Sequence, residues 1–191
     1  MRRIIESTLV SLDGVFGDPH TWAMEYFDQE AEKFALELLS DADAMLMGRR
    51  TYEFFAAAFP HQTGEYGSRI NSIRKYVFSN TLKKADWSNS TIVRGDVVAE
   101  TAKLKDQEGG ALVIYGHGLL GQTLLEHDLL DELKIWIHPL FVGRGQLLFR
   151  EGRTATLKLE ATRTLRSGTV VLTYREAKAG ISVMSPNRTN P

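Results

Sequence analysis

Along this chain, segments in which apolar residues recur at the period of a strand alternate with segments in which they recur at the period of a helix. Residues 4–12 alternate with a period of two and are rich in β-branched side chains, which predicts a first strand. Between Phe27 and Leu38 apolar residues recur at helical spacing, which predicts an amphipathic helix over 28–40. The apolar run at 43–48 is short enough for a buried strand.

The same two periods divide the rest of the chain. A helix is predicted at 49–59, where Pro60 ends the pattern, another at 96–110 with Asp96 as its N-cap, and a third after the glycines near residue 118. The polar segment 61–68 is predicted to be a loop. Further strands are predicted at 75–80, 90–95, 111–116, 132–143, 156–168 and 169–176.

Strands that alternate with helices predict a three-layer α/β/α domain with a mostly parallel sheet. The last two strands meet at Ser167-Gly168, which predicts a C-terminal antiparallel hairpin. A chain of 191 residues suits one domain, which we place at 1–177. Residues 178–191 are small and polar with prolines, and we expect a loose tail there.

Composition narrows the classes of function. Lys and Arg number 23 against 24 Asp and Glu, which argues against general nucleic-acid binding. The chain has no cysteine, and its 5 histidines show no metal-ligand spacing, so we expect no metal site. No signal peptide or run of ~20 apolar residues is visible. We therefore expect a cytoplasmic protein without nucleic-acid or membrane partners.

Three glycines, Gly116, Gly118 and Gly121, spell G-x-G-x-x-G between a predicted strand and a predicted helix. A Rossmann fingerprint would lie on the first strand–helix turn and would have an acidic residue about 20 residues later. Here the motif follows the fifth predicted strand, after four others, and the next strand ends at His138 and Pro139. The Rossmann interpretation therefore fails, but a glycine turn before a helix still suits a phosphate.

A second turn of this kind follows the strand at 43–48. Gly48 ends that strand, Arg49 and Arg50 supply two cations, and Thr51 can bond a phosphate or the helix. Taken singly, such a turn can equally be a simple chain reversal with solvated arginines. Two such turns in one small sheet favour a ligand with several phosphates.

Six segments carry a resemblance to a known family: "SLDGVFGD" (11–18), "YFDQE" (26–30), "LMGRRTYE" (46–53), "VFSNT" (77–81), "VIYGHGLLGQTLLEHDLLDEL" (113–133) and "HPLFVGRGQLLF" (138–149). In this order they resemble the dihydrofolate reductase-like superfamily. Within it, the chain is similar to bacterial proteins related to the reductase domain of the riboflavin-biosynthesis deaminase–reductase. The resemblance runs from about residue 3 to residue 175.

The resemblance implies an NADPH-dependent reductase of a small heterocyclic substrate, of the 5-amino-6-(5-phosphoribosylamino)uracil reductase or dihydrofolate reductase-like type. It also implies a mobile loop at 11–17 over the nicotinamide, and a homodimer paired through late strands. The resemblance assigns the cofactor phosphates to Gly48, Arg49, Arg50 and Thr51. It assigns the adenosine 2′-phosphate to Ser79, Asn80 and Arg94. It assigns the pyrophosphate and the nicotinamide to Gly116, His117, Gly118, Leu119 and Leu120.

The resemblance further implies a cis peptide bond in the glycine turn, which by position is Gly116–His117. His117 replaces the central glycine of the family's turn. Its side chain is therefore expected to point away from the pyrophosphate, toward solvent or the nicotinamide pocket.

The family's folate-binding carboxylate has no secure counterpart here, and its nearest candidates are Asp28 and Glu25. Asp28 is a candidate catalytic proton donor, and the alternative is that it only caps a helix. The deaminase domain is absent from this sequence. Two functions remain open: an NADPH-dependent reductase, or a nucleotide-binding or assembly module of the same fold without turnover.

Overall fold

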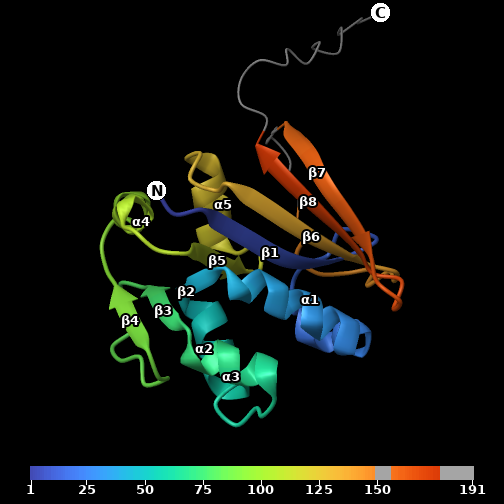
Figure 1. Ribbon diagram of the computed structural model, residues 1–191, viewed down its shortest axis with the longest axis horizontal. Coiled ribbons are helices and arrows are strands. Elements are labelled where there is room, and N and C mark those ends of the chain that lie inside the picture. The colour runs from blue at the N-terminus through green and yellow to red at the C-terminus, as the bar shows by residue number, and fades with distance from the viewer. Residues whose placement is uncertain (149–155, 177–191) are drawn as a thin grey trace, which may run out of the picture.

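The computed structural model describes residues 1–148 and 156–176, and an eight-stranded sheet runs through them in the order β4-β3-β2-β5-β1-β6-β8-β7 (Figure 1). The tail predicted at 178–191 lies outside the described residues. The strands are β1 (Ile4–Ser11), β2 (Ala42–Gly48), β3 (Arg74–Phe78), β4 (Ser90–Val93), β5 (Ala111–Tyr115), β6 (Glu132–His138), β7 (Leu157–Thr164) and β8 (Val170–Glu176).

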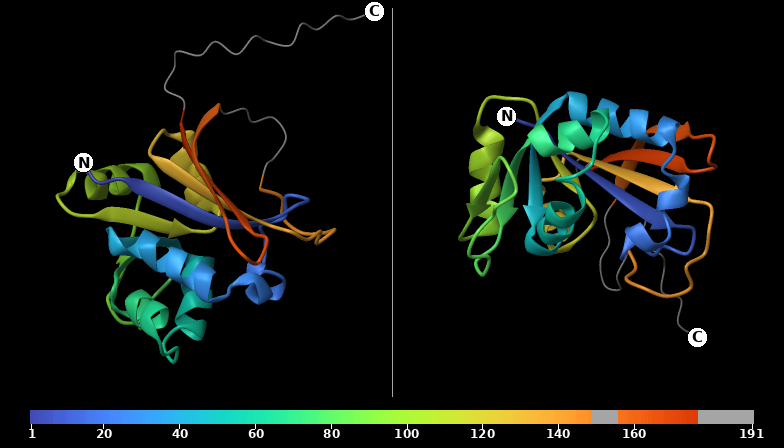
Figure 2. Two further views of the ribbon diagram at one scale, coloured as in Figure 1. Left: turned by 45° about the vertical axis from the view of Figure 1, so that its right-hand side comes forward. Right: turned by 90° about the horizontal axis from the view of Figure 1, so that it is seen from below.

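The first six strands pair in parallel, and β8 is antiparallel to both β6 and β7. This confirms the predicted mostly parallel sheet with a C-terminal antiparallel hairpin. The hairpin turns at Gly168, whose φ of 84° lies in the left-handed region that favours glycine. Figure 2 shows the hairpin at the end of the sheet that is remote from β4.

In the described part of the chain, five α-helices cover the two faces of the sheet: α1 (Gln29–Ser40), α2 (Arg49–Ala58), α3 (Glu65–Ser72), α4 (Val97–Asp106) and α5 (Leu119–Glu126). The first three share one core with one face of the sheet, where Leu39, Tyr52 and Ile70 join Met45 and Val113. They lie together in the lower half of Figure 1.

The other face packs on α4 and α5. There Leu104 and Leu124 join Leu46, Ile114 and Leu133 in a second core. Because successive strand residues point to opposite faces, Met45 and Leu46 belong to different cores. The three-layer α/β/α prediction is confirmed.

The predicted loop at 61–68 is wrong, because α3 begins within it at Glu65. Tyr66, Ile70 and Ile73 recur at helical spacing and pack against the same core. Two glycines and several polar residues interrupt this short pattern, and tertiary burial of Ile70 stabilises a helix that the local sequence only weakly favours.

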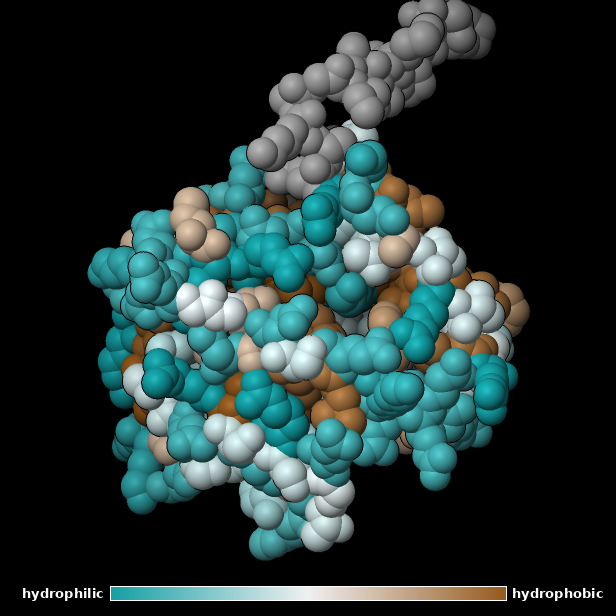
Figure 3. Space-filling view, in the orientation of Figure 1, coloured by the Kyte–Doolittle hydropathy of each residue, from teal (hydrophilic) through white to brown (hydrophobic). Residues whose placement is uncertain are grey.

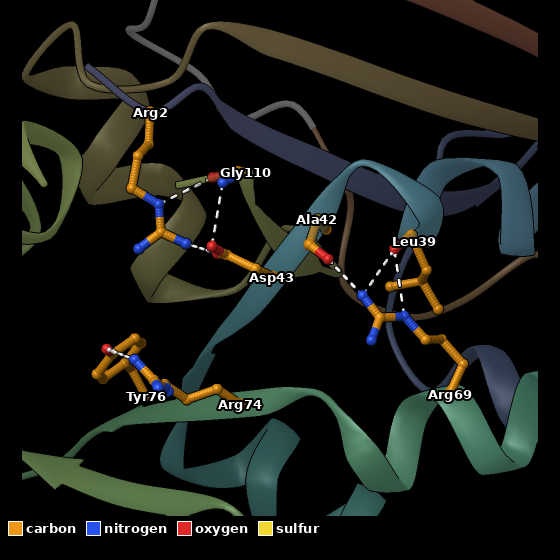
Figure 4. Close-up of polar contacts among 8 residues, drawn as sticks. All are labelled: Arg2, Leu39, Ala42, Asp43, Arg69, Arg74, Tyr76 and Gly110. Atoms are coloured by element: carbon orange, nitrogen blue, oxygen red, sulfur yellow. Dashed lines mark hydrogen bonds and ion pairs between the residues drawn. The ribbon is translucent and has the colours of Figure 1, made fainter. Parts of the chain in front are cut away.

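At the amino edge of the sheet, arginine side chains bind the protein itself (Figure 4). The Arg2 guanidinium donates to the Gly110 carbonyl at 2.8 Å and pairs with Asp43. Arg69 donates to the Leu39 carbonyl at 3.1 Å and to that of Ala42. These contacts hold the start of β2 against its neighbours, so Arg2 and Arg69 have structural roles.

The molecular surface seen in Figure 3 is mostly hydrophilic, with apolar residues in small separate patches. Within the described ranges, none of the helices is long and apolar enough to span a membrane.

Candidate functional site

The carboxyl ends of the six parallel strands meet at one edge of the sheet. At this edge Gly48 on β2 pairs with Phe78 on β3, and Phe78 pairs with Val93 on β4. On its other side β2 pairs with β5, which ends at Tyr115. The loops that follow these strands therefore lie side by side, and open α/β sheets bind ligands at such an edge.

Two helices begin at this edge without a side-chain cap. Gly48 is the N-cap of α2 and Gly118 is the N-cap of α5, and neither can offer a side-chain acceptor. By contrast, Asp28 and Asp96 cap α1 and α4 through their carboxylates. The first-turn N–H groups and positive dipole ends of α2 and α5 are therefore available to an anion.

The glycines of these two turns face open space. A Cβ atom added to Gly48, Gly116 or Gly118 would have no neighbour within 4 Å. Gly116 has a φ of 80°, in the left-handed region, and its N–H donates to the Ser7 carbonyl at 2.9 Å. The backbone thus leaves room for a close approach of phosphate groups, which fits a pyrophosphate.

A loop after β3 gathers the residues predicted to bind the 2′-phosphate. The Ser79 hydroxyl accepts from the Leu82 N–H at 2.9 Å, and the Asn80 side-chain oxygen accepts from the Gly95 N–H at 3.0 Å. Arg94 donates to the carbonyls of Asn80 and Leu82 at 3.1 and 2.8 Å. The structure thus brings Ser79, Asn80 and Arg94 together, with Arg94 bracing the loop.

Arg49 joins this loop from the start of α2. Its guanidinium donates to the Thr81 hydroxyl at 3.0 Å and to the Glu53 carboxylate at 2.7 Å. The sequence prediction missed Thr81, although it lies inside the "VFSNT" segment. Arg50 is exposed and Thr51 is half-buried at the same helix start.

The side chain of His117 is turned into the protein. The residue is 5% exposed and places Nδ1 2.7 Å from Oε1 of Glu6. Its outer edge meets the Phe16 ring at a centroid distance of 6.0 Å. The expectation of a side chain directed to solvent is wrong, because a buried carboxylate attracts the imidazole inward, and the expected direction toward the nicotinamide pocket stays a prediction.

Glu6 itself was missed by the sequence prediction. A signal for it existed, since Glu6 is a charged residue in the apolar first strand. A buried carboxylate is rare unless it has a partner.

Leu119 and Leu120 lie differently although they are neighbours in α5. Leu119 is 78% exposed at the edge, whereas Leu120 is 8% exposed and belongs to the core with Leu124. Only the main chain of Leu120 can face a ligand at this edge.

Cavities elsewhere do not coincide with these residues. One of about 670 Å³ is lined by Arg69, Arg74 and Trp87, and another of about 760 Å³ by Tyr52 and Trp87. None of the residues that line them belongs to the predicted site. In the described ranges, no three His, Cys, Asp or Glu side chains come together to hold a metal ion.

Comparison with known proteins agrees with this geometry. The sequence model of the RibD C-terminal domain matches residues 2–173. The chain belongs to the RibD C-terminal domain family. A relative, the uncharacterized protein YyaP of Bacillus subtilis (strain 168), is 29% identical over 179 residues, which cover 91% of this chain and 94% of YyaP.

Solved structures share the fold of this RibD C-terminal domain protein. A Shewanella sp. PV-4 protein, provisionally named as a riboflavin biosynthesis protein, has a TM-score of 0.74 and 22% identity, covering 93% of this chain and all (100%) of that chain. Dihydrofolate reductase from Enterococcus faecalis, complexed with NADP(H) and RAB-propyl, has a TM-score of 0.64 and 16% identity, covering 91% and 96%. The dihydrofolate reductase-like fold that the resemblance implies is confirmed.

The cis peptide bond inferred from the resemblance is wrong. The Gly116–His117 bond is trans, as is every other described peptide bond. The left-handed φ of Gly116 reverses the chain, and the inward side chain of His117 anchors the turn. This RibD C-terminal domain protein therefore forms the glycine turn with an ordinary trans backbone.

The loop at 11–17 is joined to the loop after β6. Val15 bridges Leu147, and the Phe16 N–H donates to the Gln146 carbonyl at 2.9 Å. Asp13 accepts from the Ser11 hydroxyl and from the N–H of Gly143, and these bonds lower the pKa of its carboxyl. The segment predicted to be mobile is thus hydrogen-bonded at several points.

Asp28 acts structurally as the cap of α1. Its Oδ1 accepts from the Ala31 N–H at 2.9 Å, and the residue is exposed. Glu25 is exposed in the 3₁₀ turn Met24–Tyr26. Asp28 thus caps α1, and its role as a proton donor stays a prediction.

Replacing Asp28 by alanine is expected to lower the free energy of unfolding by about 1 kcal/mol, because the Ala31 N–H loses its acceptor. Asp96→Ala removes the equivalent cap of α4 and is expected to cost a similar amount. Denaturant unfolding measures both against Asp106→Ala, an exposed residue in the last turn of α4. An Asp28→Ala loss no larger than that of Asp106→Ala would contradict the capping role.

Proposed function

We propose that this protein is an NADPH-dependent reductase of a small heterocyclic substrate. One observation carries the proposal: α2 and α5 both begin at glycine N-caps, beside open space, at the edge where β2 and β5 are neighbours. The two helices cover opposite faces of the sheet. Their N–H groups therefore suit a pyrophosphate that crosses the edge between them.

The residues present divide between two parts of such a cofactor. The turn at Gly116 and Gly118 would hold the pyrophosphate through its backbone. Arg49, beside the loop at 79–82, would hold the adenosine 2′-phosphate, since a guanidinium matches a phosphate with two parallel hydrogen bonds. The fold neighbour from E. faecalis is itself named as a complex with NADP(H), which supports this choice of cofactor.

When bound, the nicotinamide supplies the hydride, and the protein supplies binding and orientation. The RibD C-terminal domain family and the fold shared with dihydrofolate reductase support a pteridine, pyrimidine or related imine or carbonyl compound as the substrate class.

The alternative is a nucleotide-binding module of the same fold without turnover. The capping of α1 by Asp28 favours it, because the candidate proton donor then has a structural role. Steady-state NADPH oxidation with a panel of pterins and ribosylaminopyrimidines separates the two functions. Oxidation that depends on one acceptor class supports the reductase, and NADPH binding without any such oxidation supports the module.

Wild-type protein is expected to bind NADPH at least about tenfold tighter than NADH, because only NADPH offers a 2′-phosphate to Arg49. Arg49→Met is expected to weaken NADPH binding by about 10- to 100-fold and to leave NADH binding unchanged. Calorimetry measures both affinities.

The matched control is Arg74→Met, which removes an exposed arginine from the opposite edge of the sheet. It is expected to change neither affinity. Equal binding of NADPH and NADH by the wild type, or equal losses for both cofactors in Arg49→Met, would refute the 2′-phosphate assignment.

We further propose that the protein is a homodimer paired through its late strands. The outer strand β7 lies at the sheet edge, and its exposed side chains include Leu159. The outer side of an edge strand has backbone N–H and C=O groups without strand partners, and exposed apolar residues there favour pairing with a second chain. Light scattering at micromolar concentration is expected to give twice the mass of one chain, and a monomer mass would contradict the proposal.

A further inference from the structure

A carboxylate and an imidazole form a buried pair directly behind the glycine turn. Glu6 lies in the middle of the central strand β1 and is 0% exposed. Its Oε1 is 2.7 Å from Nδ1 of His117, and its Oε2 has no hydrogen-bond partner. A carboxylate with one unpaired buried oxygen is costly to keep charged.

Gly121 makes room for this carboxylate. A Cβ atom at Gly121 would lie only 2.1 Å from Oε2 of Glu6 and 3.5 Å from Nδ1 of His117. The third glycine of the G-x-G-x-x-G pattern thus borders the buried pair, whereas the first two border open space. Gly116 and Gly118 therefore leave room for a ligand outside the protein, whereas Gly121 leaves room for the Glu6 carboxyl inside it.

The surroundings of Glu6 contain little else that could balance a charge. Its register partners are Ile114 on β5 and Leu133 on β6, and Leu120 and Leu124 of α5 pack in the same core. On the loop at 11–17, Phe16 touches the imidazole. Among the described residues, His117 is the one charged or titratable group that acts on the Glu6 carboxyl, whose pKa is raised by burial.

Because burial raises the pKa of the Glu6 carboxyl, this carboxyl keeps a proton to a higher pH than an exposed one. With this proton, the pair is neutral overall. Without it, the pair carries one negative charge. That charge would lie behind His117, which stands between Gly116 and Gly118 in the turn proposed to hold phosphates, and it would repel them through a medium of low dielectric.

We propose that Glu6 and His117 are positioning residues that hold the glycine turn from behind, and that an anionic cofactor binds there only together with the proton of the pair. This inference rests on the proposed function, because it needs a phosphate-bearing cofactor at the turn. By linkage, cofactor affinity falls as the pH rises through the titration of the Glu6 carboxyl in the free protein.

The test compares wild-type protein, Glu6→Gln and Glu132→Gln for NADPH affinity between about pH 6.5 and pH 9.5, above the second pKa of a phosphate monoester, ≈ 6. Glutamine keeps the size of Glu6 and removes its charge. Glu132 is the matched control, a buried carboxylate on neighbouring β6 that pairs with Lys134 rather than with the turn. Circular dichroism checks that each variant folds.

The wild-type and Glu132→Gln Kd values are expected to rise by up to about tenfold per pH unit, the slope of a one-proton linkage. The Kd of Glu6→Gln is expected to stay nearly constant over the same range. At the steepest point for the wild type, calorimetry in two buffers of different ionisation enthalpy is expected to show uptake approaching one proton per NADPH bound. This proton count uses the wild type alone and decides the matter if Glu6→Gln does not fold.

Different failures have different meanings. A wild type that binds NADPH with no pH-dependent Kd and no proton uptake overturns the inference and leaves the proposed function intact. The same holds if Glu6→Gln keeps the wild-type slope and differs only by a constant factor, which is the result of a purely structural role. A folded wild type that binds NADPH at no pH overturns the proposed function and this inference with it.

Discussion

The parallel pairing of the central strand β1 with both β5 and β6 constrains the rest of the molecule. Parallel neighbours cannot be joined by tight turns, so the chain crosses the sheet between strands and builds the helices that cover it. The same pairing places the carboxyl ends of β1 to β6 at one edge. Since α2 and α5 cover opposite faces but start at neighbouring strands, their amino termini flank one stretch of that edge. The candidate site is a consequence of this topology, and the loops after β3 and β4 add their side chains to it.

Much of the fold could be predicted from the sequence, because its signals are local. The β-branched residues of β1, the helical period of α1 and the N-caps Asp28 and Asp96 act within one turn or one strand, and each has the expected secondary structure, although β1 is buried on both faces rather than alternately. Helix α3 could not be predicted in the same way. It has 8 residues with Gly67 inside it, so its stability depends on burying Ile70 against a core built by distant strands.

In the candidate site too, the features with a local cause could be predicted from the sequence, and those with a distant cause could not. The spacing of Gly48 and Gly118 before apolar helices predicts the two open helix starts, since glycine next to a helix acts locally. The direction of His117 has a distant cause, because its partner Glu6 is 111 positions away in the sequence. No local pattern reports which of the two sides of the turn a histidine will face. The inward contact also explains why a trans backbone suffices at Gly116, where the left-handed φ already reverses the chain.

The glycine pattern therefore meets two different needs in one short segment: space outside the protein and space in its interior. At Gly118 a side chain would enter open space, so the absence of a Cβ serves whatever approaches from outside. At Gly121 a side chain would collide with the Glu6 carboxylate, so the absence of a Cβ serves the interior. His117 lies between these positions and is the residue through which the interior contact reaches the turn. In a G-x-G-x-x-G turn the third glycine allows the helix to pack closely on a strand, and here the group that Gly121 packs against is the Glu6 carboxyl, buried in the central strand.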